Sequence, residues 1–152
     1  MTASSLSSIL LIEDDLFKQE LIEDLLTTNA FVAEISVARS VQQAVARLGE
    51  QAYDLVILDM ALPSHESKPG GAQPISQLSG GIEILLQLSF EARSDPVIIL
   101  TQYPEIEFDG SFFALAKARR AIGSKLHANI LDIIHFNAAD HAWTSKLLEK
   151  IG

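Results

Sequence analysis

The chain has 152 residues, which suits one domain with one core, and 48% of them are hydrophobic, which excludes global disorder. Its formal net charge of −9 argues against a nucleic-acid-binding protein and against docking on anionic lipid. The absence of cysteine excludes disulfides, thiolate metal sites and a cysteine nucleophile. We recognise no signal peptide and no transmembrane segment, so we expect a cytoplasmic protein that binds neither nucleic acid nor membrane.

The first half of the chain alternates apolar runs with helical patterns. Residues 9–12 predict a strand, and apolar residues at helical spacing from Leu16 to Leu26 predict a helix capped by Asp15. A weaker strand is expected at 33–37. A second helix follows, with Ser40 as its cap and its end at Gly49.

The second half continues this alternation after one irregular segment. The run 55–58 predicts a strand, but residues 64–79 are rich in Gly, Pro, Ser and Gln and indicate an inserted loop. We then expect a helix from Ile82, a strand at 97–100, a helix that starts at Phe112, a strand at 130–134 and a final helix at 142–151.

This order predicts an α/β protein with a parallel sheet and helices on both faces. Near-continuous Val, Ile and Leu runs are typical of strands that are covered on both sides. We find no internal repeat and no second domain, so we expect one domain over residues 1–152, with the loop at about 64–79 lying close to the end of the third strand.

Acidic residues follow two of the predicted strands. Glu13 and Asp14 come after the first strand, and Asp59 comes after the third. Ligands of open α/β sheets bind at the carboxyl ends of the strands, where these carboxylates would repel one another unless a cation such as Mg²⁺ were bound. The alternatives are that Glu13 and Asp14 complement a helix dipole and that Asp59 caps a turn.

These motifs resemble the receiver domain of bacterial two-component response regulators. The similarity covers residues 8–151 apart from 64–79, and its motifs are Ile12-Glu13-Asp14-Asp15, Asp59-Met60-Ala61-Leu62-Pro63 and Leu100-Thr101. The resemblance implies a flavodoxin-like, doubly wound, five-stranded parallel sheet with strand order 2-1-3-4-5.

The resemblance also implies roles for individual residues. Asp59 matches the phospho-acceptor, which attacks the phosphoryl group of a phosphohistidine on a histidine kinase or phosphotransfer protein. Glu13, Asp14, Asp59 and the backbone carbonyl of Ala61 match the Mg²⁺ ligands. Thr101 matches the hydroxyl that meets the phosphoryl oxygen and carries the signal outward. Such a protein is a phospho-acceptor that acts through protein partners, rather than an enzyme with turnover.

The chain departs from the family at the end of its last strand. The family places a Lys there, usually followed by Pro, whereas this chain has His135 and Phe136. His135 is either a partial replacement for the Lys or simply a polar residue at a strand end. Asp132 stands where many receivers have an aromatic switch residue.

Two other functions remain open. A pseudo-receiver would use the same fold as a phosphorylation-independent protein-binding module, and the missing Lys and the inserted loop favour it. A hydrolase of the related phosphatase type has an Asp-x-Asp pattern at its nucleophile. Here Met60 and Ala61 follow Asp59, so the second Asp, the general acid, is absent. The last two helices and the last strand, with Trp143 and Phe112-Phe113, are either core or a face for a partner or a second copy of the chain.

Overall fold

The computed structural model describes residues 5–29, 31–65, 76–77 and 80–151 and is built around a five-stranded sheet. Its strands lie in the order β2-β1-β3-β6-β9, and every neighbouring pair is parallel. Counted within this sheet, the order is 2-1-3-4-5, as the resemblance implied. The strands are β1 (Ser5–Ile12), β2 (Phe31–Ala38), β3 (Leu55–Leu58), β6 (Val97–Thr101) and β9 (Ile130–His135).

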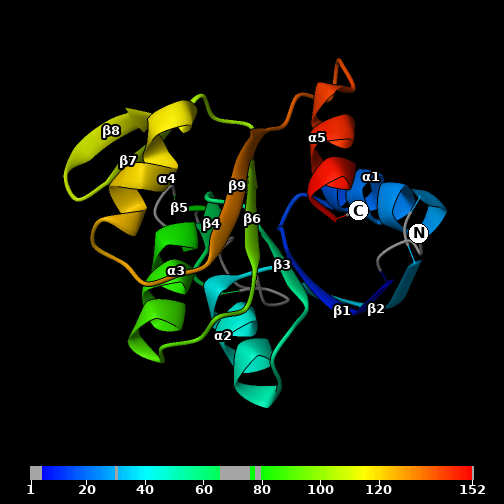
Figure 1. Cartoon of the computed structure of the whole chain (residues 1–152), viewed down its shortest axis with the longest axis horizontal. Helices are drawn as coiled ribbons and strands as arrows, with labels where there is room; N and C mark the ends of the chain where they lie inside the picture. The colour runs from blue at the N-terminus through cyan, green and yellow to red at the C-terminus, as the bar shows by residue number, and fades with distance from the viewer. Residues whose placement is uncertain (1–4, 30, 66–75, 78–79, 152) are drawn as a thin grey trace, which may run out of the picture.

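Helices cover both faces of this sheet (Figure 1). One face carries α1 (Leu16–Asn29) and α5 (Ala142–Ile151), and the other carries α2 (Val41–Glu50), α3 (Gly80–Phe90) and α4 (Leu115–Gly123). Alternate residues of β1 belong to the two apolar cores: Ile9 and Leu11 to one, Leu10 and Ile12 to the other. The predicted doubly wound α/β fold is therefore confirmed. No helix in the described ranges is both long and apolar enough to cross a membrane.

Two helix starts follow the predicted capping. The Asp15 carboxylate accepts from the backbone N–H of Phe17 at 2.9 Å and of Lys18 at 3.2 Å. Ser40 Oγ accepts from the N–H of Gln43 at 3.1 Å. Each side chain satisfies N–H groups that have no partner within the first turn of a helix, so both helices begin where the sequence predicted.

The prediction of a helix from Phe112 was wrong, because a β-hairpin precedes α4. Its strands, β7 (Glu105–Phe108) and β8 (Ser111–Ala114), pair antiparallel across Asp109 and Gly110. Both turn residues have positive φ, 54° and 81°, as a two-residue hairpin turn requires, and Asp-Gly is a preferred sequence for it. Buried and exposed residues alternate along β7, which is the strand period.

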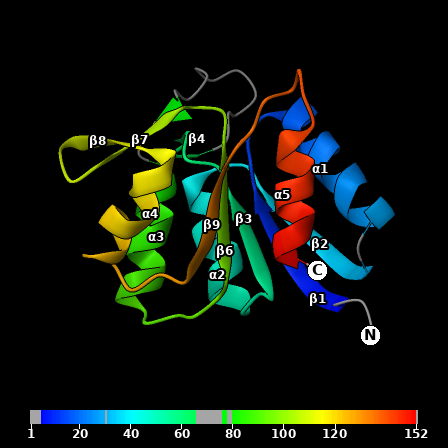
Figure 2. The same cartoon turned by 45° about the horizontal axis from the view of Figure 1, so that its top comes forward.

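The segment predicted as an inserted loop lies partly outside the described residues, which omit 66–75 and 78–79. Its described part differs from a plain loop, because β5 (Ser76–Gln77) pairs antiparallel with β4 (Leu62–Pro63). The pairing brings the two ends of the segment together just beyond Asp59. Figure 2 shows β4 and the β7–β8 hairpin at the end of the molecule where the sheet strands have their carboxyl termini.

Candidate functional site

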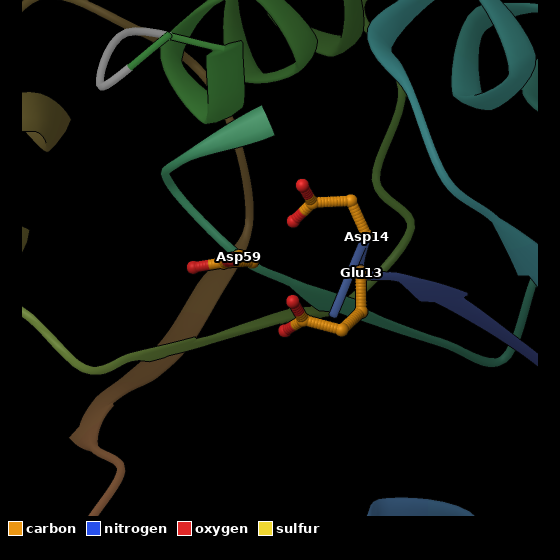
Figure 3. Close-up of side chains that lie close together, drawn as sticks. All are labelled: Glu13, Asp14 and Asp59. Carbon is orange, nitrogen blue, oxygen red and sulfur yellow. The ribbon is translucent and has the colours of Figure 1, made fainter. Parts of the chain in front are cut away.

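Three carboxylates meet at the carboxyl edge of the sheet. Glu13 and Asp14 follow β1 and Asp59 follows β3; Ile12 and Leu58, the last residues of these strands, are paired in register. One carboxylate oxygen from each residue lies within 4.8 Å of the others. Figure 3 shows the three carboxylates pointing to the same side. The predicted cluster is therefore present in the fold.

The cluster is unusually buried for acidic residues. Glu13 is 1% exposed and Asp59 5%, while Asp14 is half-buried. Burial raises the pKa of Glu13 to about 8, with Lys18 opposing the shift and Asp59 adding to it. Burial likewise raises the pKa of Asp59, against the opposing charge of Lys18. Carboxylates that lie this close together and are shielded from solvent are stable as anions only beside a cation.

The segment after Asp59 is held by close packing against the start of α3. The Ala61 N–H donates to the Asp59 carboxylate, and the Gly81 N–H donates to the Met60 carbonyl at 2.9 Å. A Cβ at Gly81 would lie 2.8 Å from the Asp59 carbonyl oxygen, so no larger residue fits without a shift of backbone. The absence of a side chain at Gly81 therefore lets the start of α3 pack directly against the segment that carries Asp59, which holds this segment in place.

Thr101 and His135 are paired in register at the ends of β6 and β9, but their environments differ. Thr101 is fully buried, and its Oγ1 accepts from the Tyr103 N–H at 3.2 Å. His135 is exposed, and its Nε2 lies 3.1 Å from the Gln102 carbonyl oxygen, which can only accept a hydrogen bond. Of the ion pairs found among the described residues, none involves His135.

Lys18 is a site residue that the sequence analysis missed. Its Nζ lies 2.7 Å from Glu13 Oε1, 2.7 Å from the Leu100 carbonyl oxygen and 3.5 Å from Asp59 Oδ1. The residue is only 1% exposed. Its ammonium thus touches groups at the ends of three neighbouring strands, β1, β3 and β6, and is the cation beside the two buried carboxylates.

The helical period explains why this lysine points inward. The buried residues of α1 are Lys18, Ile22 and Leu26, which are spaced four apart and share one face of the helix. A lysine at the first position of such a stripe was the signal available in the sequence. The Phe136 ring lies below the ammonium, with its centroid 5.3 Å from Nζ.

A doubly wound parallel sheet with a buried acidic cluster at its carboxyl edge defines a flavodoxin-like protein with a ligand site at that edge. Residues 9–119 match the model of the response regulator receiver domain family. The Detocs response regulatory protein DtcB of Vibrio alginolyticus is 34% identical over 146 residues, which cover 93% of this chain and 97% of that protein. The chain belongs to the response regulator receiver domain family.

Solved receiver structures share the fold at low sequence identity. The Mn²⁺-bound form of response regulator Rcp1 is 19% identical, with a TM-score of 0.64 over 94% of this chain and 90% of that one. Response regulator TrrA of Thermotoga maritima, solved in complex with Mg²⁺ and BeF, is 20% identical, with a TM-score of 0.61 over 96% and 99%. The family match ends at residue 119, so β9 and its departures at Asp132, His135 and Phe136 lie beyond it.

Proposed function

We propose that the chain accepts a phosphoryl group on Asp59 from the phosphohistidine of a histidine kinase or phosphotransfer protein. The observation that carries this proposal is the state of the Asp59 carboxylate. It is buried at the carboxyl edge of the sheet, and its Oδ1 has no hydrogen-bond partner among the described residues. A buried carboxylate oxygen without a donor is costly to maintain and is available as a nucleophile.

In this reaction an Asp59 oxygen forms a bond to phosphorus as the phosphorus–nitrogen bond of the donor breaks. The bonding electron pair stays on the departing imidazole, which takes up a proton, and Asp59 becomes an acyl phosphate. Catalysis of such a transfer depends on positioning and on neutralising the phosphoryl oxygens. The rigid packing of Gly81 against Met60 supports the positioning.

The residues at this edge fit a divalent cation, because Glu13, Asp14 and Asp59 offer converging oxygen ligands of the kind that Mg²⁺ takes. Together with the carbonyl of Ala61 they are the proposed ligands. When bound, Mg²⁺ would neutralise charge on the phosphoryl oxygens. The Mn²⁺ in the Rcp1 structure and the Mg²⁺ in the TrrA structure support this assignment.

Thr101 is the proposed sensor of the phosphoryl group. Its Oγ1 accepts from the Tyr103 N–H, so the hydroxyl proton remains for donation to a phosphoryl oxygen. His135 is a weaker candidate for a phosphoryl contact, since its Nε2 faces the Gln102 carbonyl. The output is proposed to be a protein contact in the cytoplasm, with another protein or a second copy of the chain. The solved complex of CheX with CheY from Borrelia burgdorferi supports the first kind.

The test is incubation with acetyl phosphate and Mg²⁺, followed by intact mass measurement. Wild type should gain one phosphoryl group, Asp59→Asn should gain none, and the control Asp140→Asn, at an exposed residue, should behave like wild type. Gain by the Asp59→Asn variant would place the acceptor elsewhere. No gain in wild type, from acetyl phosphate or from phosphoramidate, would exclude this function for the isolated chain.

The second candidate is the pseudo-receiver, a protein-binding module on this fold that is never phosphorylated. The exposed position of His135 and the ion pair of Lys18 with Glu13 favour it, because a fixed internal cation can balance the acids without a metal. Binding of the same partner by wild type and by Asp59→Asn, with no phosphate incorporation in either, would support this alternative.

A further inference from the structure

We propose that Lys18 provides the ammonium that stabilises the phosphoryl group on Asp59, in place of a lysine at the end of the last strand. The inference rests on the proposed function and deepens it. The contact then comes from a residue of α1, near the start of the chain, whereas His135 stands at the end of the last strand, β9.

The reach of Lys18 is sufficient without any movement of α1. Its Nζ lies 3.5 Å from Asp59 Oδ1, which is longer than a good N–H···O hydrogen bond. That oxygen has no hydrogen-bond partner among the described residues. A phosphoryl group attached to Asp59 would bring additional oxygens beside the ammonium, where a rotation of the lysine side chain suffices for contact.

The charge of the site favours such a rotation. In the present structure the ammonium is shared among the Glu13 carboxylate, the Asp59 carboxylate and the neutral carbonyl of Leu100. Phosphorylation replaces the single charge of Asp59 by a group of higher negative charge. A charged phosphoryl oxygen attracts the ammonium by a Coulomb interaction that a neutral carbonyl lacks, so a phosphoryl oxygen competes well against the Leu100 carbonyl.

The end of β9 is arranged to receive this lysine. Phe136 is 6% exposed and its ring lies 5.3 Å from Nζ, a distance at which an aromatic face attracts a cation. The neighbouring His135 is exposed and contacts Gln102 instead. The two departures at this strand end therefore have one explanation: β9 supports an ammonium that comes from α1.

The contact with Leu100 links Lys18 to the proposed sensor. Leu100 directly precedes Thr101 in β6, and Phe136, below the ammonium, donates its N–H to the Thr101 carbonyl at 2.7 Å. An ammonium that leaves the Leu100 carbonyl for a phosphoryl oxygen changes the hydrogen bonding on both sides of Thr101. This gives Lys18 a role in reporting phosphorylation as well as in stabilising it.

The experiment uses four forms of the whole chain besides Asp59→Asn: wild type, Lys18→Met, Lys18→Met with His135→Lys, and the control Lys117→Met at an exposed position of α4. Methionine keeps most of the length of the side chain and removes the charge. The double variant returns an ammonium from β9. Each form is treated with acetyl phosphate and Mg²⁺, and the rate of phosphoryl gain and the Mg²⁺ affinity are measured separately.

We expect Lys18→Met to gain the phosphoryl group at least tenfold more slowly, which is the scale of losing one charge-stabilising donor. Its Mg²⁺ affinity should not fall, Lys117→Met should match wild type, and the double variant should recover part of the rate. Equal rates for wild type and Lys18→Met would overturn the inference and leave the proposed function standing. No gain in wild type would overturn both.

One further outcome would also overturn the inference. If wild type binds no Mg²⁺ and gains no phosphoryl group, while Lys18→Met does both, the lysine is an internal cation in place of the metal. Circular dichroism checks that each variant is folded. If Lys18→Met does not fold, wild type with ¹³C-labelled lysine decides: beryllofluoride with Mg²⁺ should shift the Cε resonance of the buried lysine, and an unchanged resonance would reject the contact.

Discussion

The Phe136 ring contacts both the Lys18 ammonium and the Trp143 indole. Nζ is 5.3 Å from the centroid of this ring, and the centroid of Trp143 is 5.0 Å from it, at an interplanar angle of 50°. Trp143 is the single tryptophan of the chain and is 3% exposed. This intrinsic fluorophore is thus connected to the acidic cluster through the side chains of Phe136 and Lys18. Its burial makes Trp143 a core residue and not part of a surface for a partner.

The first prediction concerns this fluorophore. Beryllofluoride with Mg²⁺ should change the intensity or wavelength of Trp143 emission in wild type, because displacement of a charge from the Phe136 face alters the field at the indole. Phe136→Leu should reduce the response by more than half while beryllofluoride still binds. Emission that is identical with and without saturating beryllofluoride would contradict an arrangement in which Lys18 moves.

The second prediction concerns the pH dependence of Mg²⁺ binding. Because burial raises the pKa of Glu13 from 4.5 to about 8, protons compete with a metal ion for this carboxyl as the pH falls. Apparent Mg²⁺ affinity should rise by up to tenfold per pH unit until about pH 8 and then level off. Calorimetry at several pH values measures this, and Glu13→Gln should reduce the slope, leaving the part that comes from Asp59, whose pKa burial also raises.

The same pKa shift has a consequence for stability without metal. A carboxyl whose folded pKa exceeds its unfolded value contributes stability that is fully present below about pH 4.5 and is lost as the pH rises through about 8. The contribution of Glu13 to unfolding free energy should therefore fall over that window, and Mg²⁺ should restore it. Urea unfolding of wild type and Glu13→Gln, with and without Mg²⁺, separates the contribution from that of other groups.

The third prediction concerns two glycines in different surroundings, Gly81 and Gly49. A Cβ at Gly81 would lie 2.7 Å from Met60 Sδ and 2.8 Å from backbone atoms of Asp59 and Met60. Gly81→Ala should lower stability by about 1–3 kcal/mol and slow phosphorylation, because the segment carrying Asp59 must shift. Gly49→Ala in α2, with nothing within 4 Å of its Cβ, should be neutral or stabilising. Similar effects of both substitutions would contradict this packing.

The fourth prediction concerns the opposite edge of the sheet. Arg93 binds both oxygens of Asp95, at 2.9 and 3.0 Å, and Asp95 also accepts from the Tyr53 N–H at 2.8 Å. Burial alone would raise the pKa of Asp95, but these hydrogen bonds outweigh it and hold the pKa below 3.8. Asp95→Asn should lower stability by about 1.5–3 kcal/mol and leave phosphorylation unchanged.

The sign of the pH effect at Asp95 is opposite to that at Glu13. A depressed pKa gives a contribution that is present above about pH 3.8 and is lost as the pH falls through the lowered pKa. Acid unfolding should therefore begin at higher pH in Asp95→Asn than in wild type. Matching acid transitions in the two proteins would show that the Arg93 contact adds nothing to stability.

Most of the fold was predictable because its strands are covered on both sides. Runs such as 55–58 and 97–100 have no polar residue, and the fully buried strands β3 and β6 lie in the middle of the sheet. The acidic cluster was predictable for the same reason, since Asp59 ends a run of this kind. Parallel neighbours then bring it beside Glu13 without any information about side-chain packing.

The hairpin and Lys18 escaped the sequence analysis for different physical reasons. Phe112 and Phe113 were read as helix residues, although the Asp109-Gly110 turn before them was a hairpin signal. Lys18 lies at a helical position where a lysine is normally solvated, and its burial depends on tertiary contacts with Leu100 and Phe136 from distant strands. Local pattern carries no information on such contacts, so only the assembled fold reveals them.

The antiparallel pair of β4 and β5 has a practical consequence for protein engineering. Pro63 and Ser76 are paired, so these two positions of the chain lie side by side. Because the entropy cost of closing a loop grows only slowly with its length, the connection between two adjacent positions tolerates large insertions. A circularly permuted fluorescent protein spliced between these positions would have both attachment points beside the Asp59 segment, which makes the junction a starting point for a genetically encoded phosphorylation reporter.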